Sequence, residues 1–170
     1  MKRHPSLHAL SEHHHHALVQ ALQIKRLSGR PAAKREDHAR LLAREFLRFW
    51  RRAGRRHFRE EEELLLPAYA RHVPLESDAA VIRMLADHAA IRSRIDGLQQ
   101  LLAAGEALEK HLAALGRALH DHVRLEENEI FPRIEATLGD DDLRRLRLSR
   151  LHGARGPGRK IRMKSTKKGG

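Results

Sequence analysis

Two segments of the sequence repeat the same arrangement of histidine and glutamate. The first runs from His57 to Pro67 and the second from His122 to Pro132. In each segment, glutamates follow the histidine at four and five residues, and a proline follows it at ten. Because positions i and i+4 stack on one face of an α-helix, each segment presents an imidazole and a carboxylate on the same side. A helix offers two ligands to a metal ion in this way.

The segments that precede the two repeats also correspond to one another. Apolar residues follow His14 at three, seven and ten residues, and they follow His88 at the same three offsets. We interpret the chain as two halves of an internal duplication. Each half contributes one lone histidine and one histidine–glutamate pair.

The composition predicts that helices position these residues. Ala, Leu, Arg and Glu dominate the 170 residues and only 4% are aromatic, a balance that favours helices over sheets. The chain has no cysteine, so any metal ion must be held by histidine and carboxylate. We expect a cytoplasmic protein, because there is no apolar run of membrane-spanning length and no signal-peptide core near Met1.

Hydrophobic periodicity and capping residues predict four long helices and a short fifth one. The predicted fold is an all-α, antiparallel up-down four-helix bundle within residues 1–152. We expect the second helix to carry Leu64 and Leu65 on its buried face, and Pro67 to mark its end or a kink. The five predicted helices span residues 5–29, 34–66, 78–105, 106–131 and 140–151.

Six polar residues lie on the predicted apolar faces. A buried carboxylate without a partner costs several kcal/mol, and a whole domain is stable by only about 5–15 kcal/mol. We therefore expect two cations, each held by imidazoles and bridged by both carboxylates. A single inward histidine is more often a satisfied core residue than a ligand, so the repeated set carries this prediction. The six residues are His14, His57, Glu61, His88, His122 and Glu126.

The lone histidine of the first helix belongs to a run of four, residues 13–16. His14 is centred best on the apolar face of this helix, and His13 is the second choice. The other two histidines would point outward or sideways.

The order His, His-x3-Glu, His, His-x3-Glu on successive helices resembles the hemerythrin-like domain, also called the HHE cation-binding domain. Residues 10–18 and 126–132 match the usual sequence of its first and fourth helices. The resemblance spans roughly residues 6–138 and implies a non-haem di-iron centre inside a four-helix bundle, with an oxo or hydroxo group between the metals. Manganese and zinc would suit the same ligand types. The implied ligands are His14 and His57 for one iron, His88 and His122 for the other, and Glu61 and Glu126 as bridges.

The sequence departs from the oxygen-carrying hemerythrins at two positions. Arg92 stands where they have a further histidine, which leaves an open coordination position or a water. Their second bridging acid corresponds to Glu127, but Glu126 repeats the four-residue spacing of the first segment, and we favour it over Glu127.

Exchangeable positions suit redox chemistry with oxygen, peroxide or nitric oxide better than reversible oxygen storage. Whether this chemistry makes the protein an enzyme is left open by the sequence. The alternative is an iron-sensing, storage or regulatory module without turnover, whose bundle orders on metal loading.

Much of the net charge of +12 lies at the C-terminal end of the chain. Residues 155–168 carry seven Lys or Arg and no acid. Such a composition cannot bury apolar surface, and we expect residues 153–170 to form a disordered basic tail. Contact with nucleic acid or a partner protein is expected only through this tail, which could equally be a solubilising end.

Overall fold

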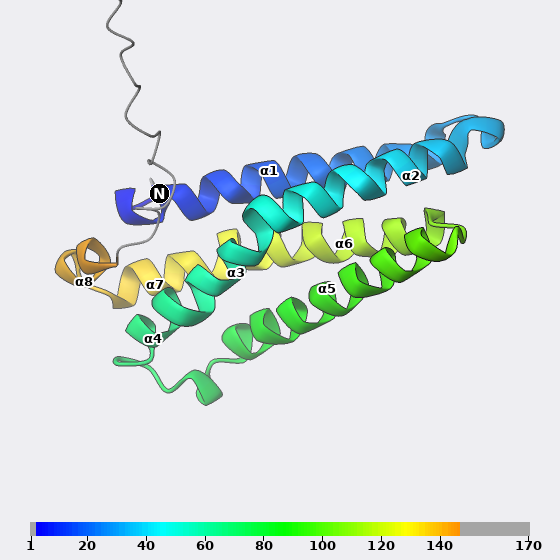
Figure 1. The fold of residues 1–170 in the computed structure, drawn as a ribbon. Coiled ribbons are helices and arrows are strands. Elements are labelled where there is room, and N and C mark those ends of the chain that lie inside the picture. The colour runs from blue at the N-terminus through cyan, green and yellow to red at the C-terminus, as the bar shows by residue number, and fades with distance from the viewer. Residues whose placement is uncertain (1–2, 147–170) are drawn as a thin grey trace, which may run out of the picture.

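The structure is a computed structural model of the chain, and it describes residues 3–146. These residues form helices and connecting turns, with no β-strand among them, so the predicted all-α class is confirmed. Figure 1 shows the long helices lying side by side, with α6 against both α1 and α5. Within residues 3–146, no helix combines the length and the apolarity that crossing a membrane requires. The long helices are α1 (His8–Lys25), α2 (Ala32–Phe49), α5 (Ala79–Ala104) and α6 (Glu109–Leu125).

The helix that begins with α2 continues without a break through four further segments. Two of them are π-helical turns, which carry more residues per turn than an α-helix. These are η3 (Trp50–Gly54) and η4 (Glu61–Leu65), and they alternate with α3 (Arg55–Glu60) and α4 (Leu66–Tyr69). We call α2 through α4 the second rod, and α1 and α5 the first and third rods.

The fourth rod, α6 through α7, follows the same pattern. A π turn, η6 (Glu126–Ile130), separates α6 from α7 (Phe131–Thr137). The helix therefore continues past Pro132, and the predicted end near residue 131 is wrong. In both rods the π turn begins at the glutamate four residues after the histidine, and the proline lies in the first turn of the next α segment.

The π turn in the second rod changes which leucines are buried. In a regular α-helix, Leu64 and Leu65 would share the buried face. The wider turn in η4 rotates the following residues, so Leu64 is 42% exposed while Leu65 and Leu66 are buried. The prediction for Leu64 is wrong because it assumed 3.6 residues per turn throughout.

The third rod begins and ends at the predicted capping residues. The Asp78 carboxylate accepts hydrogen bonds from the backbone N–H groups of Ala80 and Val81. Gly105 ends α5 with a φ of 74°, a conformation that glycine adopts without steric cost. Short helical segments complete the described chain: η1 (Pro5–Leu7), η2 (Arg26–Gly29), η5 (Leu75–Ser77) and α8 (Asp140–Arg145). The last helix ends at Arg145, followed by an extended Leu146, so the predicted continuation to about Leu151 is wrong. The predicted basic tail lies outside the described residues.

Two apolar clusters fill the interior. Between them lies a layer of buried histidines and glutamates, which we call the polar layer. On α1, Leu10 belongs to one cluster and Ala17 to the other, with His14 between them. On α5, the residues from the two clusters that flank the layer are Met84 and Ile91. The polar layer is therefore closed at both ends by packed apolar side chains, which keep bulk water away from it.

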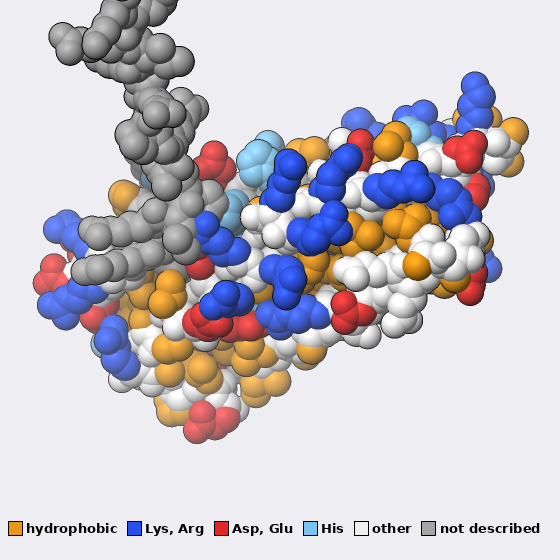
Figure 2. Space-filling model, in the orientation of Figure 1, with side chains coloured by type: hydrophobic (Ala, Val, Ile, Leu, Met, Phe, Trp, Pro, Cys, Tyr) orange, Lys and Arg blue, Asp and Glu red, His pale blue; other side chains and the backbone are white. Residues whose placement is uncertain are grey.

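Exposed arginines follow the outer side of the second rod. Figure 2 shows Lys and Arg side chains gathered over α2 and α3. This side of the rod is solvated, and the opposite side faces the polar layer. The exposed arginines of this stretch are Arg44, Arg48, Arg51, Arg52, Arg55 and Arg59.

Gly54 allows the Trp50 ring to pack against the second rod. A Cβ added at Gly54 would lie 2.3 Å from Cε3 of Trp50, although the φ of −60° suits any residue. We expect Gly54→Ala to lower the free energy of unfolding by about 1–3 kcal/mol through overpacking. Gly29→Ala is the matched control, because nothing lies within 4 Å of its added Cβ. Urea unfolding measures both, and equal stabilities of the two variants would contradict the prediction.

Candidate metal centre

Six buried side chains from the four rods converge in the polar layer. They form two groups of four, and within each group one ligand atom of every residue lies within 4.8 Å of the others. Both glutamates belong to both groups, which is the arrangement that bridging ligands need. The first group is His14, His57, Glu61 and Glu126, and the second is Glu61, His88, His122 and Glu126.

The rods explain why these side chains meet. His57 lies on α3 and Glu61 is the first residue of η4, so the spacing between them is still that of an α-helix. His122 and Glu126 repeat this placement on α6 and η6. The histidine–glutamate pairs face the lone histidines of the first and third rods, and all six residues are at most 6% exposed.

Within each pair, the imidazole and the carboxylate lie next to each other. Nε2 of His57 is 3.2 Å from Oε1 of Glu61. Nε2 of His122 is 3.1 Å from Oε1 of Glu126. The two repeated segments therefore have nearly the same local geometry.

The lone histidines direct Nε2 toward carboxylates of other rods. Nε2 of His14 is 2.9 Å from Oε2 of Glu126 and 3.7 Å from Oε1 of Glu61. Nε2 of His88 is 3.4 Å from Oε1 of Glu126 and 3.5 Å from Oε2 of Glu61. All four rings thus present the same nitrogen to the same two carboxylates.

The chemistry of the polar layer fits a metal ion. Both oxygens of Glu61 and both oxygens of Glu126 are buried without a hydrogen-bond partner of good geometry among the described residues. Nε2 of His88 and of His122 is in the same condition. Buried polar atoms are normally satisfied, and convergent imidazole and carboxylate donors suit iron, manganese or zinc.

Two of the imidazoles have raised pKa values in the metal-free protein. Burial opposes protonation of His14, but the neighbouring carboxylates, Glu126 foremost, raise its pKa well above the usual value. Burial also opposes protonation of His88, but Glu126 and Glu61 raise its pKa to about 10. Burial lowers the pKa of His57 to about 4 and keeps that ring neutral. Its Nε2 lies 2.9 Å from Nε2 of His14, so only one of the two nitrogens can carry a proton there.

The two carboxylates are ionised beside these imidazoles. Burial raises the pKa of Glu126, but His122, His14 and His88 outweigh burial and hold this pKa well below its usual value. The pKa of Glu61 is also lowered by the surrounding histidines, although burial and Glu126 act in the opposite direction. Two imidazolium protons can therefore balance two carboxylates. A metal ion that binds these rings must displace their protons.

The two alternative ligands lie outside both groups. The ring centroid of His13 is 5.3 Å from that of His57. Oε1 of Glu127 lies 2.6 Å from Nδ1 of His14, on the side of the ring that faces away from the carboxylate pair. This geometry favours His14 over His13, and Glu126 over Glu127, as candidate ligands.

Arg92 and Glu62 make a contact that the sequence reasoning missed. The sequence predicts that Arg92, in place of a histidine ligand, leaves an open position beside the metal. Its Nη2 lies 2.8 Å from each carboxylate oxygen of Glu62, and Oε1 of Glu62 lies 2.7 Å from Nδ1 of His88. The sequence contained a signal for the contact between Glu62 and a histidine, because Glu62 and Glu127 occupy the same position in the two repeats.

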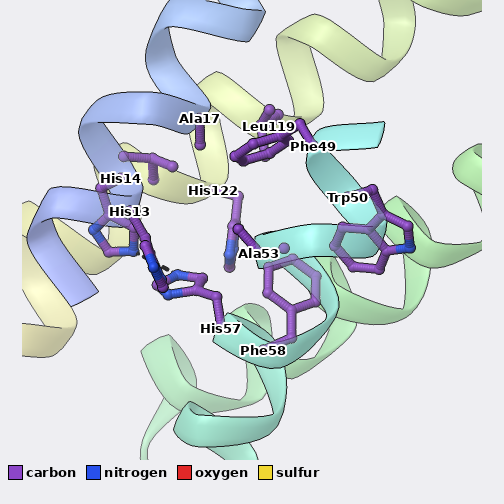
Figure 3. A pocket seen from close by; sticks show the side chains of 12 residues that line it. His13, His14, Ala17, Phe49, Trp50, Ala53, His57, Phe58, Leu119 and His122 are labelled. Atoms are coloured by element: carbon purple, nitrogen blue, oxygen red, sulfur yellow. Dashed lines mark hydrogen bonds between the residues drawn. The ribbon is translucent and has the colours of Figure 1, made fainter. Parts of the chain in front are cut away.

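A small cavity adjoins the centre on the side of His57 and His122. Figure 3 shows these two rings together with His13 and His14, and with Phe49, Trp50 and Phe58 from the second rod. The space open to a water-sized molecule is about 20 Å³. This is room for roughly one water or one diatomic molecule.

The model of one protein family, described as the hemerythrin HHE cation binding domain, matches residues 6–134. The match covers well over half of the chain and includes all six converging residues. No curated protein and no solved structure matches the chain.

Proposed function

Because the chain belongs to the hemerythrin HHE cation-binding domain family, we propose that it binds a pair of iron ions in the polar layer and uses them in redox chemistry or sensing with oxygen, peroxide or nitric oxide. The observation that carries the proposal is the convergence of six buried donors in two groups that share both carboxylates. The proposed ligands are His14 and His57 at one position, His88 and His122 at the other, and Glu61 and Glu126 at both.

A bound iron pair supplies the one- and two-electron chemistry that protein side chains lack. The residues of the chain prepare the site for it. The two apolar clusters exclude bulk water from the polar layer, and this strengthens every interaction of the carboxylates with a cation. The loss of the Nε2 protons of His14 and His88 on metal binding removes two positive charges, and this offsets part of the charge that the metal ions bring. The cavity beside His57 and His122 has room for one molecule of the size of oxygen.

The test is metal analysis of the full chain purified without a histidine tag. We expect about two irons per chain, with a visible absorption spectrum that disappears when a chelator removes the iron. A protein that retains no iron, manganese or zinc after purification, and takes up none when they are added, would contradict the proposal.

The reaction with hydrogen peroxide distinguishes a redox enzyme from a sensor. Repeated turnover of peroxide by the iron-loaded protein, absent from the metal-free form, would identify an enzyme. A single oxidation of the iron without turnover, together with iron-dependent binding of a partner, would identify a sensing module.

Other features of the proposal extend the sequence-based predictions. We propose an antiparallel up-down order for the four rods and a short fifth helix at the C-terminal end. We also propose a division into a bundle, residues 1–152, and a basic tail, residues 153–170. The side-by-side packing of α6 with α1 and α5 supports the bundle. The cytoplasmic location and the contact of the tail with nucleic acid stay predictions.

A further inference from the structure

Two carboxylates outside the ligand groups contact the far edges of the two lone imidazoles. Oε1 of Glu127 lies 2.6 Å from Nδ1 of His14, and Oε1 of Glu62 lies 2.7 Å from Nδ1 of His88. An imidazole whose Nδ1–H donates to a carboxylate has Nε2 free to bind a metal. In both rings Nε2 is the nitrogen that faces Glu61 and Glu126.

An arginine holds each of these carboxylates from the other side. Nη2 of Arg3 is 2.6 Å from Oε2 of Glu127 and 3.2 Å from its backbone carbonyl oxygen. Nη2 of Arg92 is 2.8 Å from each oxygen of Glu62. Each carboxylate is therefore fixed between a guanidinium and an imidazole, and neither can rotate without breaking a charge-assisted hydrogen bond.

A phenylalanine ring covers one face of each lone imidazole. Phe58 stacks on His88 with ring centroids 3.7 Å apart, and Phe131 stacks on His14 with centroids 5.1 Å apart. The same two arginines lie over these phenylalanines, Arg92 at 5.2 Å from the Phe58 centroid and Arg3 at 5.1 Å from the Phe131 centroid. Both imidazoles are thus restrained at one edge and on one face.

The similarity of the two repeats explains only part of these contacts. Glu62 and Glu127 are equivalent residues of the two repeats, but the arginines are not: Arg92 follows His88 by four residues, and Arg3 precedes His14 by eleven. The phenylalanines also occupy different places in their repeats. The same three contacts are therefore built twice from different sequence positions. By contrast, Nδ1 of His57 and of His122 is buried without a hydrogen-bond partner among the described residues.

We propose that Glu62 and Glu127 are positioning residues, which orient His88 and His14 so that Nε2 of each ring points at its metal position. Arg92 and Arg3 hold the two carboxylates in place. This inference rests on the proposed metal-binding function, and it adds that each carboxylate acts on one metal position only. Glu127 serves the position of His14 and His57, and Glu62 serves the position of His88 and His122.

Cobalt(II) titration of the full-length variants Glu127→Leu and Glu62→Leu tests the proposal. Each change should weaken binding at one position by about 10–100-fold and leave the other unchanged, because outer partners of ligating histidines contribute about this much. The double variant should weaken both positions. Glu127→Gln and Glu62→Gln should lose less, since the amide oxygen still accepts the Nδ1–H bond. Glu63→Gln is the matched control, because this exposed side chain pairs only with Arg59 among the described residues.

The ring N–H proton resonances of the cobalt-loaded protein provide a second readout that separates positioning from a merely structural role. Glu127→Leu should shift or remove the resonance of the His14 Nδ1–H and leave that of His88, and Glu62→Leu should do the reverse. Equal losses at both positions, or wild-type affinity and spectra in both Leu variants, would overturn the inference. If the wild-type chain binds neither cobalt nor iron, the proposed function fails. If the wild-type chain binds cobalt and both Leu variants bind it equally well, the positioning role fails alone.

Discussion

Replacing Glu61 by Ala should remove both metal ions, whereas replacing His122 by Ala should remove only one. Glu61 belongs to both ligand groups and His122 to only one of them. We therefore expect the iron content to fall from about two per chain to near zero in Glu61→Ala, and to about half of the wild-type value in His122→Ala. Metal analysis after dialysis against a weak chelator measures both.

His120→Ala is the control for these two variants. His120 lies two residues from His122 on the same helix, but its exposed ring contacts Asp121 and is not in either ligand group. It should retain the full metal content. Two irons in Glu61→Ala, or equal losses in all three variants, would show that the shared carboxylates do not hold the metals.

Metal binding should release protons and become stronger as the pH rises. In the metal-free protein the surrounding carboxylates, acting against burial, raise the pKa of His14 and His88. A metal ion binds the neutral imidazole, so each position must lose about one proton. Each released proton makes the apparent affinity rise by about tenfold per pH unit. His57 contributes no proton above about pH 6, because burial lowers its pKa to about 4.

Calorimetric titration in buffers with different ionisation enthalpies counts these protons directly. We expect about two per chain between about pH 6.5 and about pH 8. An affinity that does not change over this range would mean that His14 and His88 are neutral before the metal binds.

The same protons give the stability of the metal-free protein a pH dependence opposite to that of metal binding. The pKa of a histidine in the unfolded chain is about 6.5, and that of His88 is raised to about 10 in the folded protein. The folded state therefore binds more protons, and the stability that this provides is present below about pH 6.5 and lost as the pH rises toward 10. The difference in urea midpoint between metal-loaded and metal-free protein should accordingly grow with pH.

The sequence predicted the residues that converge but not the backbone that supports them. The His57–Glu61 and His122–Glu126 spacings identify ligand pairs because an α-helix stacks i and i+4, and the structure keeps that spacing up to each glutamate. The π turns begin at these same glutamates. Hydrophobic periodicity cannot reveal them, since apolar residues on both sides still recur at helical intervals.

Long-range contacts of charged residues were also beyond the sequence. Arg92 resembles a missing ligand when only its distance along the helix from His88 is known. Its partner Glu62 lies 30 residues away, and the partner of Arg3 lies 124 residues away. Which of 34 basic and 22 acidic residues pair with one another depends on the packing of the rods, which local patterns do not specify.

The segment before α1 has a practical consequence for handling the protein. The backbone N–H of His4 donates to Glu135 at 2.6 Å, and its ring contacts Asp140 at 2.8 Å, so these first residues lie against α7 and α8 and bring Arg3 to Glu127. A purification handle fused directly ahead of them would crowd this corner and compete for the same acids. Because Arg3 holds Glu127 and Glu127 contacts His14, we expect such crowding to lower the iron content at the position of His14 first. Cleaving such a handle, and comparing the iron content before and after cleavage, would measure how far added residues at this end disturb the centre.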